Sequence, residues 1–293
     1  MKQELSILIP TYNDKCLALV KELCHQAEQE DCLLGYEIIV ADDGSTDPKI
    51  VQENKEINNL KHCRYIIQPS NIGRSAIRNL LATLSVYPWL MFLDADMSIV
   101  SEGFLHNYLS SEGQVIYGGY QVIGNKNTSL RYRYEKKAEF MQQASVRNQH
   151  PYQDFHSSNF LIQRALMLSH PFDERFRYYG YEDVLLGKIF KENHIQITHI
   201  DNPVGFNVFE TNEHFITKTE EALRTLHTFS TELKGYSRLL DVSMRINRLG
   251  LTPLTRVFFN LFKAKMRAHL CNSHPSLLAF KYYKLGYFIS LTK

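Results

Sequence analysis

Short apolar runs alternate with longer amphipathic stretches through the first hundred residues of the chain. The short runs are uninterrupted, as in strands that are buried on both faces of a sheet. The longer stretches repeat apolar residues at helical spacing, as Leu19, Val20 and Leu23 do. We predict strands at 5–10, 36–41, 63–68 and 89–93 and helices at 16–30, 50–60 and from 75 to 85. This order predicts a mostly parallel sheet with right-handed crossovers, flanked by helices.

The pattern is less regular beyond residue 100. The predicted elements are strands at 115–123, 156–163 and 195–200, a long helix at 130–147, a helix that starts at 182–183, a loop at 203–205, and helices from 217 onward with breaks near 235, 250–253 and 275. We expect one α/β domain over 1–215, in halves of about 1–100 and 101–215, and a helical extension over 216–293.

Three of the predicted strands end in polar loops, which read TYND, DDGSTD and DADM. Because the carboxyl ends of parallel strands share one edge, these loops predict a crevice for a nucleotide with a divalent cation beside its phosphates. Asp94 and Asp96, separated by the small Ala95, are the candidate metal ligands. Turn formation or helix capping is the alternative for these acids and for residues 44–47. The adjacent Asp42 and Asp43 repel each other and need a ligand or a hydrogen-bond donor.

A glycine and two arginines mark the segment NIGRSAIRN. Gly73 permits a tight turn, and Arg74 and Arg78 lie one helical turn apart. A helix N-terminus with guanidinium donors favours a diphosphate contact, and a solvated basic helix face is the alternative. No GxGxxG follows the first strand, which argues against an ordinary dinucleotide-binding domain.

Two acids begin the helix predicted after residue 181. Glu182 and Asp183 would be favourable there through the helix dipole alone. The tyrosines around Gly180 are not explained by that effect, and they form a candidate platform for stacking on a sugar.

Five segments, in this order, resemble the pattern of glycosyltransferase family 2 over Ser6 to about Phe209: SILIPTYN, IIVADDGSTD, NIGRSAIRN, FLDADM and YGYEDVLLG. The resemblance implies a GT-A, Rossmann-like fold whose first half binds a sugar nucleotide, usually a UDP-sugar, and whose second half binds the acceptor. Relatives often carry a histidine after the acidic helix, where this chain has Phe206 and Asn207. His199 and His214 flank that position, and we expect them to be packed or surface residues.

The resemblance also implies roles for individual residues. Asp183 would be the catalytic base, Asp94 and Asp96 would hold Mn²⁺ or Mg²⁺, and Asp42 would contact the base of the nucleotide. The implied donor-binding residues are Pro10, Thr11, Tyr12, Asp42, Asn71, Gly73, Arg78, Asp94 and Ala95, and the implied acceptor-binding residues are Gly180, Tyr181 and Glu182.

Inverting transfer is one in-line displacement, which needs a carboxylate beside the attacking hydroxyl and charge stabilisation of the departing diphosphate. Asp183 fits the first role, and a cation on Asp96 fits the second. The resemblance therefore implies a hexosyl- or N-acetylhexosaminyltransferase that acts on a glycan or lipid-linked acceptor in surface polysaccharide biosynthesis. The alternatives are a non-catalytic sugar-nucleotide or glycan-binding module and a sugar nucleotidyltransferase, whose glycine-rich first loop is absent from TYND.

Charge is unevenly distributed along the chain. The net charge is +2, yet residues 242–293 hold nine Lys or Arg and no acid, interleaved with aromatic and apolar residues that include Phe258, Phe259, Leu261, Phe262, Phe280, Tyr282, Tyr283, Tyr287 and Phe288. This composition predicts an interfacial anchor on an anionic membrane, and packing on the catalytic domain is the alternative. No nucleic-acid motif accompanies the charge. Without a leader or a spanning apolar run, we expect a cytoplasmic protein, peripheral on the inner face of the cell membrane.

Overall fold

The computed structural model describes residues 1–292, which form two compact units. The first unit comprises Met1–Ile123, Phe140–Arg177 and Glu182–Val208. The second comprises Gly124–Glu139, Tyr178–Tyr181 and the chain from Phe209 onward. The domain boundary expected after residue 215 therefore lies just inside the second unit, which also takes up two earlier segments.

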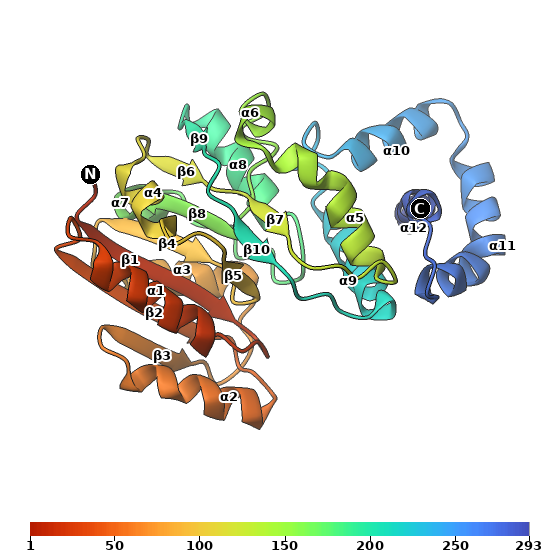
Figure 1. Ribbon diagram of the computed structural model, residues 1–293. Coiled ribbons are helices and arrows are strands. Elements are labelled where there is room, and N and C mark those ends of the chain that lie inside the picture. The colour runs from red at the N-terminus through yellow and green to blue at the C-terminus, as the bar shows by residue number, and fades with distance from the viewer. Residues whose placement is uncertain (293) are drawn as a thin grey trace. The chain divides into compact units, whose positions relative to one another are not determined.

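A seven-stranded sheet forms the centre of the first unit, in the order β3-β2-β1-β4-β8-β6-β9 (Figure 1). Its strands are β1 (Glu4–Thr11), β2 (Gly35–Asp42), β3 (Cys63–Ile67), β4 (Trp89–Leu93), β6 (Val115–Tyr117), β8 (Asn159–Gln163) and β9 (Ile197–His199). The first four strands run parallel, as predicted, and β8 is antiparallel to both of its neighbours. The sheet is therefore mostly parallel within a mixed α/β fold.

Helices pack on both faces of this sheet. The helices of the first unit are α1 (Leu17–Gln29), α2 (Pro48–Asn54), α3 (Arg74–Leu84), α4 (Phe104–Ser110), α6 (Ala144–Arg147), α7 (Arg164–Ser169) and α8 (Glu182–Glu192), and the 3₁₀ helix η1 (Lys55–Asn59) follows α2. Strand β1 explains why both faces are covered. Ile7 and Ile9 belong to one apolar cluster with α1, whereas Leu8 belongs to a second cluster with α3. Burial on both faces is the origin of the uninterrupted apolar runs.

The strand predicted at 115–123 is broken at Gly118 and Gly119. A Cβ atom at Gly118 would lie 2.4 Å from the backbone oxygen of Asn202, and Gly119 has φ +83. The chain therefore turns after β6, and β7 (Tyr120–Val122) leaves the central sheet.

The prediction of a loop at 203–205 is wrong, because this segment forms strand β10 (Val204–Phe206). It pairs with β5 (Met97–Ile99) and β7 in a separate three-stranded sheet. Gly205 is needed for this pairing rather than for a turn, since a Cβ there would lie 2.5 Å from the Ser98 hydroxyl. The helix predicted at 130–147 is also broken, into α5 (Leu130–Ala138), a 3₁₀ turn at Glu139–Gln142 and α6.

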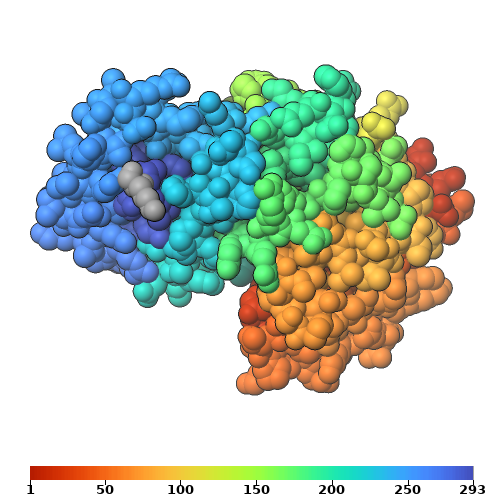
Figure 2. Space-filling model, turned by 180° about the vertical axis from the view of Figure 1, so that it is seen from behind, coloured from red at the N-terminus to blue at the C-terminus, as the bar shows by residue number. Residues whose placement is uncertain are grey.

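The second unit is helical. Besides α5 it contains α9 (Asn212–Thr228), α10 (Arg238–Arg248), α11 (Thr252–Cys271) and α12 (Leu277–Leu291), with the predicted breaks near Gly235, at 250–253 and at Pro275. Figure 1 shows α12 end-on among these helices, and Figure 2 shows the surface of the α10–α11 segment in blue. No helix of the described residues is long and apolar enough to cross a membrane.

Packing within this unit corrects part of the predicted anchor. Five aromatic residues that the sequence placed at a membrane are instead buried against neighbouring helices. They are Phe259 of α11 and Phe280, Tyr283, Tyr287 and Phe288 of α12. These side chains therefore pack within the second unit itself, whereas Phe258, Leu261, Phe262 and Tyr282 are exposed.

Candidate functional site

Three polar loops lie side by side at the carboxyl ends of β1, β2 and β4. Thr11 and Asp42 are register partners in β1 and β2. Leu8 pairs with Phe92 of β4, so the residues just after each strand meet at one edge of the sheet. The predicted convergence of TYND, DDGSTD and DADM is therefore present.

Asn13 ties the first two loops together. Its side-chain oxygen accepts the backbone N–H groups of Thr46 and Asp47 at 2.9 and 3.0 Å, and its own N–H donates to the Ser45 hydroxyl at 2.7 Å. Asp47 in turn caps α2 by accepting from Lys49 N at 2.9 Å. Capping, the alternative to ligation, is therefore right for Asp47.

The donors that Asp42 and Asp43 need come from the chain itself. Asp42 accepts from Ser45 N at 2.7 Å and from the Tyr65 hydroxyl, and it is fully buried. Asp43 accepts from the N–H groups of Ile72 and Gly73 at 2.7 and 3.0 Å. Burial nevertheless raises the pKa of Asp43 above its usual value. The contact of Asp42 with a nucleotide base stays a prediction.

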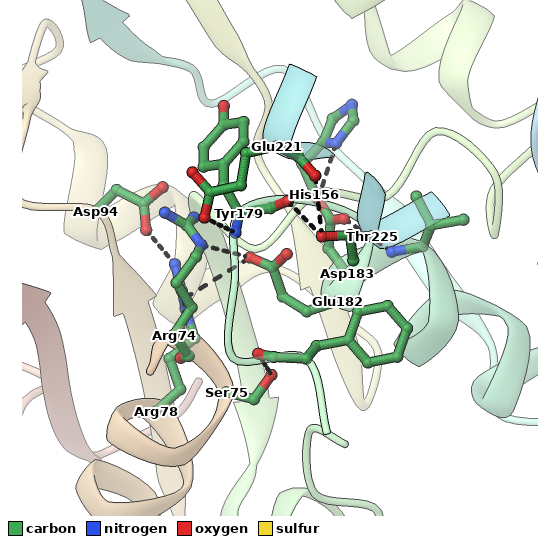
Figure 3. Close-up of polar contacts among 12 residues, drawn as sticks. Arg74, Ser75, Arg78, Asp94, His156, Tyr179, Glu182, Asp183, Glu221 and Thr225 are labelled. Carbon is green, nitrogen blue, oxygen red and sulfur yellow. Dashed lines mark hydrogen bonds and ion pairs between the residues drawn. The ribbon is translucent and has the colours of Figure 1, made fainter. Parts of the chain in front are cut away.

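A buried arginine joins the Asp-x-Asp segment to the acids of α8 (Figure 3). Arg78 is 2% exposed, donates to Asp94 Oδ1 at 2.5 Å and lies 3.9 Å from Glu182 Oε1. Arg74 Nε donates to the same oxygen of Glu182 at 2.9 Å. A solvated basic face is therefore the wrong description of Arg78, because its charge is balanced by carboxylates on two different elements.

Gly73 sets the position of these arginines. Its φ is +98, and a Cβ there would lie 3.1 Å from the backbone of Arg177, so only glycine fits without strain. Helix α3 begins directly after this turn, with Arg74 and Arg78 on successive turns. The loop before α8 therefore packs against the start of α3.

Asp183, the candidate base, has a partner that sequence reasoning did not identify. Its Oδ2 lies 3.1 Å from His156 Nδ1, and its Oδ1 accepts from Val184 N at 2.8 Å. Burial raises the pKa of Asp183, but the His156 hydrogen bond and the charges of His156 and Arg74 outweigh burial, so the pKa lies below its usual value. Asp183 is therefore ionised at neutral pH and can accept a proton.

His156 reaches this position through the antiparallel strand β8. Asn159 of β8 pairs with Leu93 of β4, and Asp94 N donates to Ser158 O at 3.1 Å. The residues before β8 therefore run alongside the Asp-x-Asp segment. The only sequence signal for this contact was a histidine at the start of a predicted strand. Such a histidine cannot be assigned a role until the neighbouring strand is known.

The segment Tyr178–Tyr181 belongs to the second unit and is held there by α9. Tyr179 N donates to Glu221 Oε1 at 3.2 Å, and Thr225 Oγ1 donates to Tyr179 O at 3.2 Å (Figure 3). Gly180 has φ +95 and passes so close to α9 that a Cβ would lie 2.9 Å from the side chain of Ala222. Both the turn and the close approach therefore require glycine.

Tyr181 also has a left-handed backbone, with φ +71. This conformation is costly for a bulky residue, and residues held in it cluster at functional sites. Tyr178 is 70% exposed, which leaves its ring available for stacking. These properties fit the acceptor-binding role predicted for the segment.

The other candidates differ in accessibility. Tyr12 and Asn71 are exposed, Pro10 and Asp96 are half-buried, and Ala95 is buried. Thr11 is buried and donates from its hydroxyl to Asp14 O at 3.1 Å. Tyr12, Asn71 and Asp96 are therefore more accessible to a ligand at this edge than the buried candidates are.

The Asp-x-Asp segment fits a cation that shares its ligands with a substrate. Among the described residues, no three His, Cys, Asp or Glu side chains form a group that could hold a metal ion. Asp94 already binds Arg78, and Asp96 adds a second carboxylate. Mg²⁺ is commonly bound by one or two carboxylates together with substrate phosphates and water, and the chemistry of these residues fits that arrangement.

The two histidines that flank Phe206 in the sequence are packed or at the surface, as expected. His199 is 3% exposed, between Arg147 at 2.8 Å and the backbone oxygen of Pro151 at 2.8 Å. Burial lowers the pKa of His199 to about 4, so it stays neutral. His214 is exposed on α9, and Phe206, at the position where relatives often carry histidine, is buried in β10.

Two curated proteins are similar to part of this chain. A chondroitin synthase from Escherichia coli is 40% identical over 98 residues, which cover 32% of this chain and 13% of that protein. An uncharacterised glycosyltransferase from Haemophilus influenzae is 31% identical over 100 residues, which cover 33% of this chain and 38% of that protein. The matched regions thus span well under two thirds of either relative.

Solved structures match nearly the whole chain at low identity. TarS from S. aureus, residues 1–349, aligns with a TM-score of 0.52 and 15% identity over 98% of this chain and 90% of that one. The same protein in complex with UDP-GlcNAc aligns with a TM-score of 0.51 at 15% identity over the same shares. These likenesses establish the GT-A type of fold. The family model of glycosyl transferase family 2 matches residues 6–168, more than half of the sequence, and the chain belongs to that family.

Proposed function

We propose that this glycosyltransferase moves a sugar, with inversion at the anomeric carbon, from a UDP-sugar to a hydroxyl group of a glycan or lipid-linked acceptor. A hexosyl or N-acetylhexosaminyl group is the expected cargo, and surface polysaccharide biosynthesis is the expected setting. The complexes of TarS with UDP and UDP-GlcNAc support a nucleotide-sugar donor. The partial similarity to a chondroitin synthase supports a glycan acceptor.

One observation carries the proposal. Arg78 is bound to Asp94, of the donor motif, and lies within 3.9 Å of Glu182, the residue before the candidate base. A displacement at an anomeric carbon needs the leaving diphosphate and the proton acceptor on opposite sides of one small group. The buried guanidinium of Arg78 contacts both the Asp-x-Asp segment and Glu182 at the start of α8, which is consistent with that requirement.

In the proposed reaction, Asp183 accepts the proton of the attacking hydroxyl as the bond to the anomeric carbon forms and the bond to the diphosphate breaks. Arg74 and Arg78 hold Glu182, whose carboxylate orients the acceptor. The positive charge of these arginines also favours the departing UDP. A divalent cation on Asp94 and Asp96 would supply further charge stabilisation of the leaving group when bound.

A thermal-shift screen of nucleotide sugars, with and without Mn²⁺, tests the donor assignment. At about 100 times its Kd, a ligand that binds only the folded state adds about 2.7 kcal/mol of stability. We expect UDP-sugars to raise the unfolding temperature more than GDP-mannose does, and Mn²⁺ to increase the effect. UDP release in the presence of the stabilising donor then separates an enzyme from a binding module, since a module would give stabilisation without turnover.

His156→Gln is expected to move the acid limb of the pH profile of transfer to higher pH. The hydrogen bond and charge of His156 lower the pKa of Asp183, so their loss lets Asp183 take up a proton at a higher pH. Below that pH the carboxyl can no longer act as a base. The measurement is kcat/KM against pH. His150→Gln, at an exposed histidine of the same unit, is the matched control and should leave the profile unchanged; coinciding profiles for the two variants would refute the role of His156.

A further inference from the structure

Helix α11 has one apolar face that is not covered by the chain. Its residues recur at intervals of three and four, the spacing of one helical face, and they are Leu254, Val257, Phe258, Leu261 and Phe262. Leu254, Phe258 and Leu261 are 68%, 59% and 71% exposed. We call these five residues the α11 stripe. Contiguous exposed apolar surface of this kind marks an interaction site.

The opposite face of α11 packs within the second unit. Phe259 is buried against α12, where a Cβ on Gly286 would lie 2.3 Å from its ring. Arg256 donates to Thr292 O, and Arg267 pairs with Glu213 at 3.1 Å. The orientation of α11 is therefore fixed by its inner face, and exposure of the stripe is a consequence of that packing.

Exposed basic residues occur on α11 and on α10, whose first turn also holds Asp241. Lys265 lies one turn beyond Leu261 and Phe262 on the exposed side of α11, and Arg245 and Arg248 are exposed on α10. Arg256, Arg267 and Lys263, which lies 5.2 Å from the centre of the Tyr287 ring, are engaged within the unit. Lys265, Arg245 and Arg248 are therefore open to solvent, and no acidic residue occurs from 242 to the end of the chain.

We propose that the α11 stripe inserts into the headgroup region of an anionic phospholipid bilayer, with Lys265, Arg245 and Arg248 on the lipid phosphates. Apolar area and electrostatic attraction together determine the strength of such interfacial binding. A second copy of the chain fits less well. Two stripes brought face to face would bring like charges together, which is unfavourable. The proposal does not depend on which sugar the enzyme transfers.

Co-sedimentation of the full-length protein with vesicles tests this surface. The protein should bind vesicles that contain phosphatidylglycerol more tightly than vesicles of phosphatidylcholine alone, and added salt should weaken the binding. Phe258→Gln/Leu261→Gln should weaken binding at least about tenfold, because both side chains lose their apolar contact with lipid. Lys265→Gln should weaken it about fivefold, the effect expected for one basic residue near the surface.

Matched controls separate this surface from general changes in apolarity or charge. Leu34→Gln removes an apolar side chain that is 75% exposed in the first unit, and Lys61→Gln removes an exposed charge there. Both variants should bind vesicles like the wild type, and thermal unfolding should be unchanged in every variant. Absence of binding by the wild type, or equal binding by the stripe variant, would overturn the proposal. Self-association that the stripe variant abolishes, without vesicle binding, would assign the stripe to a second copy instead.

Discussion

Asp183→Asn should lower the rate of sugar transfer by about a hundredfold or more while donor binding persists. Asparagine has the shape of aspartate and can still accept the hydrogen bond from Val184 N, which Asp183 Oδ1 accepts at 2.8 Å. It cannot take the proton of the attacking hydroxyl. The change therefore removes the base from the reaction without removing the side chain from the start of α8.

Single-turnover transfer and donor titration by thermal shift together measure this effect. Asp173→Asn is a suitable control, because Asp173 is a carboxylate of the same unit whose pKa is lowered by its hydrogen bond to Arg175. That variant should transfer sugar at the wild-type rate. If Asp183→Asn lost donor binding in proportion to its rate, Asp183 would be a nucleotide ligand and a different base would have to be found.

Asp96→Ala should abolish metal-dependent release of UDP and leave the fold intact. Asp96 is half-buried at the end of the Asp-x-Asp segment, where a carboxylate is expected to share a cation with the donor diphosphate. Without it, the cation is held by Asp94 alone, and Asp94 is already bound to Arg78. The expected readouts are loss of UDP release and loss of the extra stabilisation that Mn²⁺ gives in the presence of UDP.

Asp94→Ala should differ from this variant in stability. Removal of Asp94 leaves Arg78, which is 2% exposed, without the ion pair at 2.5 Å. Breaking a buried pair on one side costs about 3 kcal/mol, the lower end of the usual range, since Asp94 is partly accessible. A lower unfolding temperature in Asp94→Ala but not in Asp96→Ala would show that Asp94 also stabilises the fold through Arg78, a role that Asp96 does not have. Unchanged turnover in Asp96→Ala would contradict the metal assignment.

The first half of the fold was predictable because its local pattern and its tertiary environment agree. Strands buried on both faces must be apolar at every position, as β1 and β4 are, and the polar loops after them could only meet at one edge. The roles of individual donor residues came from the resemblance to the family and stay a prediction. Arg78 was predictable as a basic residue near an acidic site, since a charge on a helix that packs on the sheet needs a partner.

His156 and β10 were not predictable, for different reasons. The contact between His156 and Asp183 depends on β8 lying antiparallel to β4, which no local pattern specifies. Strand β10 is three residues long and contains glycine, so propensity favours a loop. In the tail, composition identified aromatic and basic helices, but only the packing of α12 on its neighbours separates Phe259, which is buried, from Phe258, which is exposed.

The attachment of Tyr178–Tyr181 to α9 has a consequence for chimeric enzymes. Glu221, Ala222 and Thr225 fix this segment, and Glu182 and Asp183 follow it directly in the sequence. The C-terminal helices are therefore not a cassette that can be exchanged between related transferases to retarget them. A chimera that exchanges the chain from near Phe209 onward replaces α9, which supports residues 178–181. That segment ends two residues before the candidate base. Productive recombination therefore requires moving residues 178–181 together with α9.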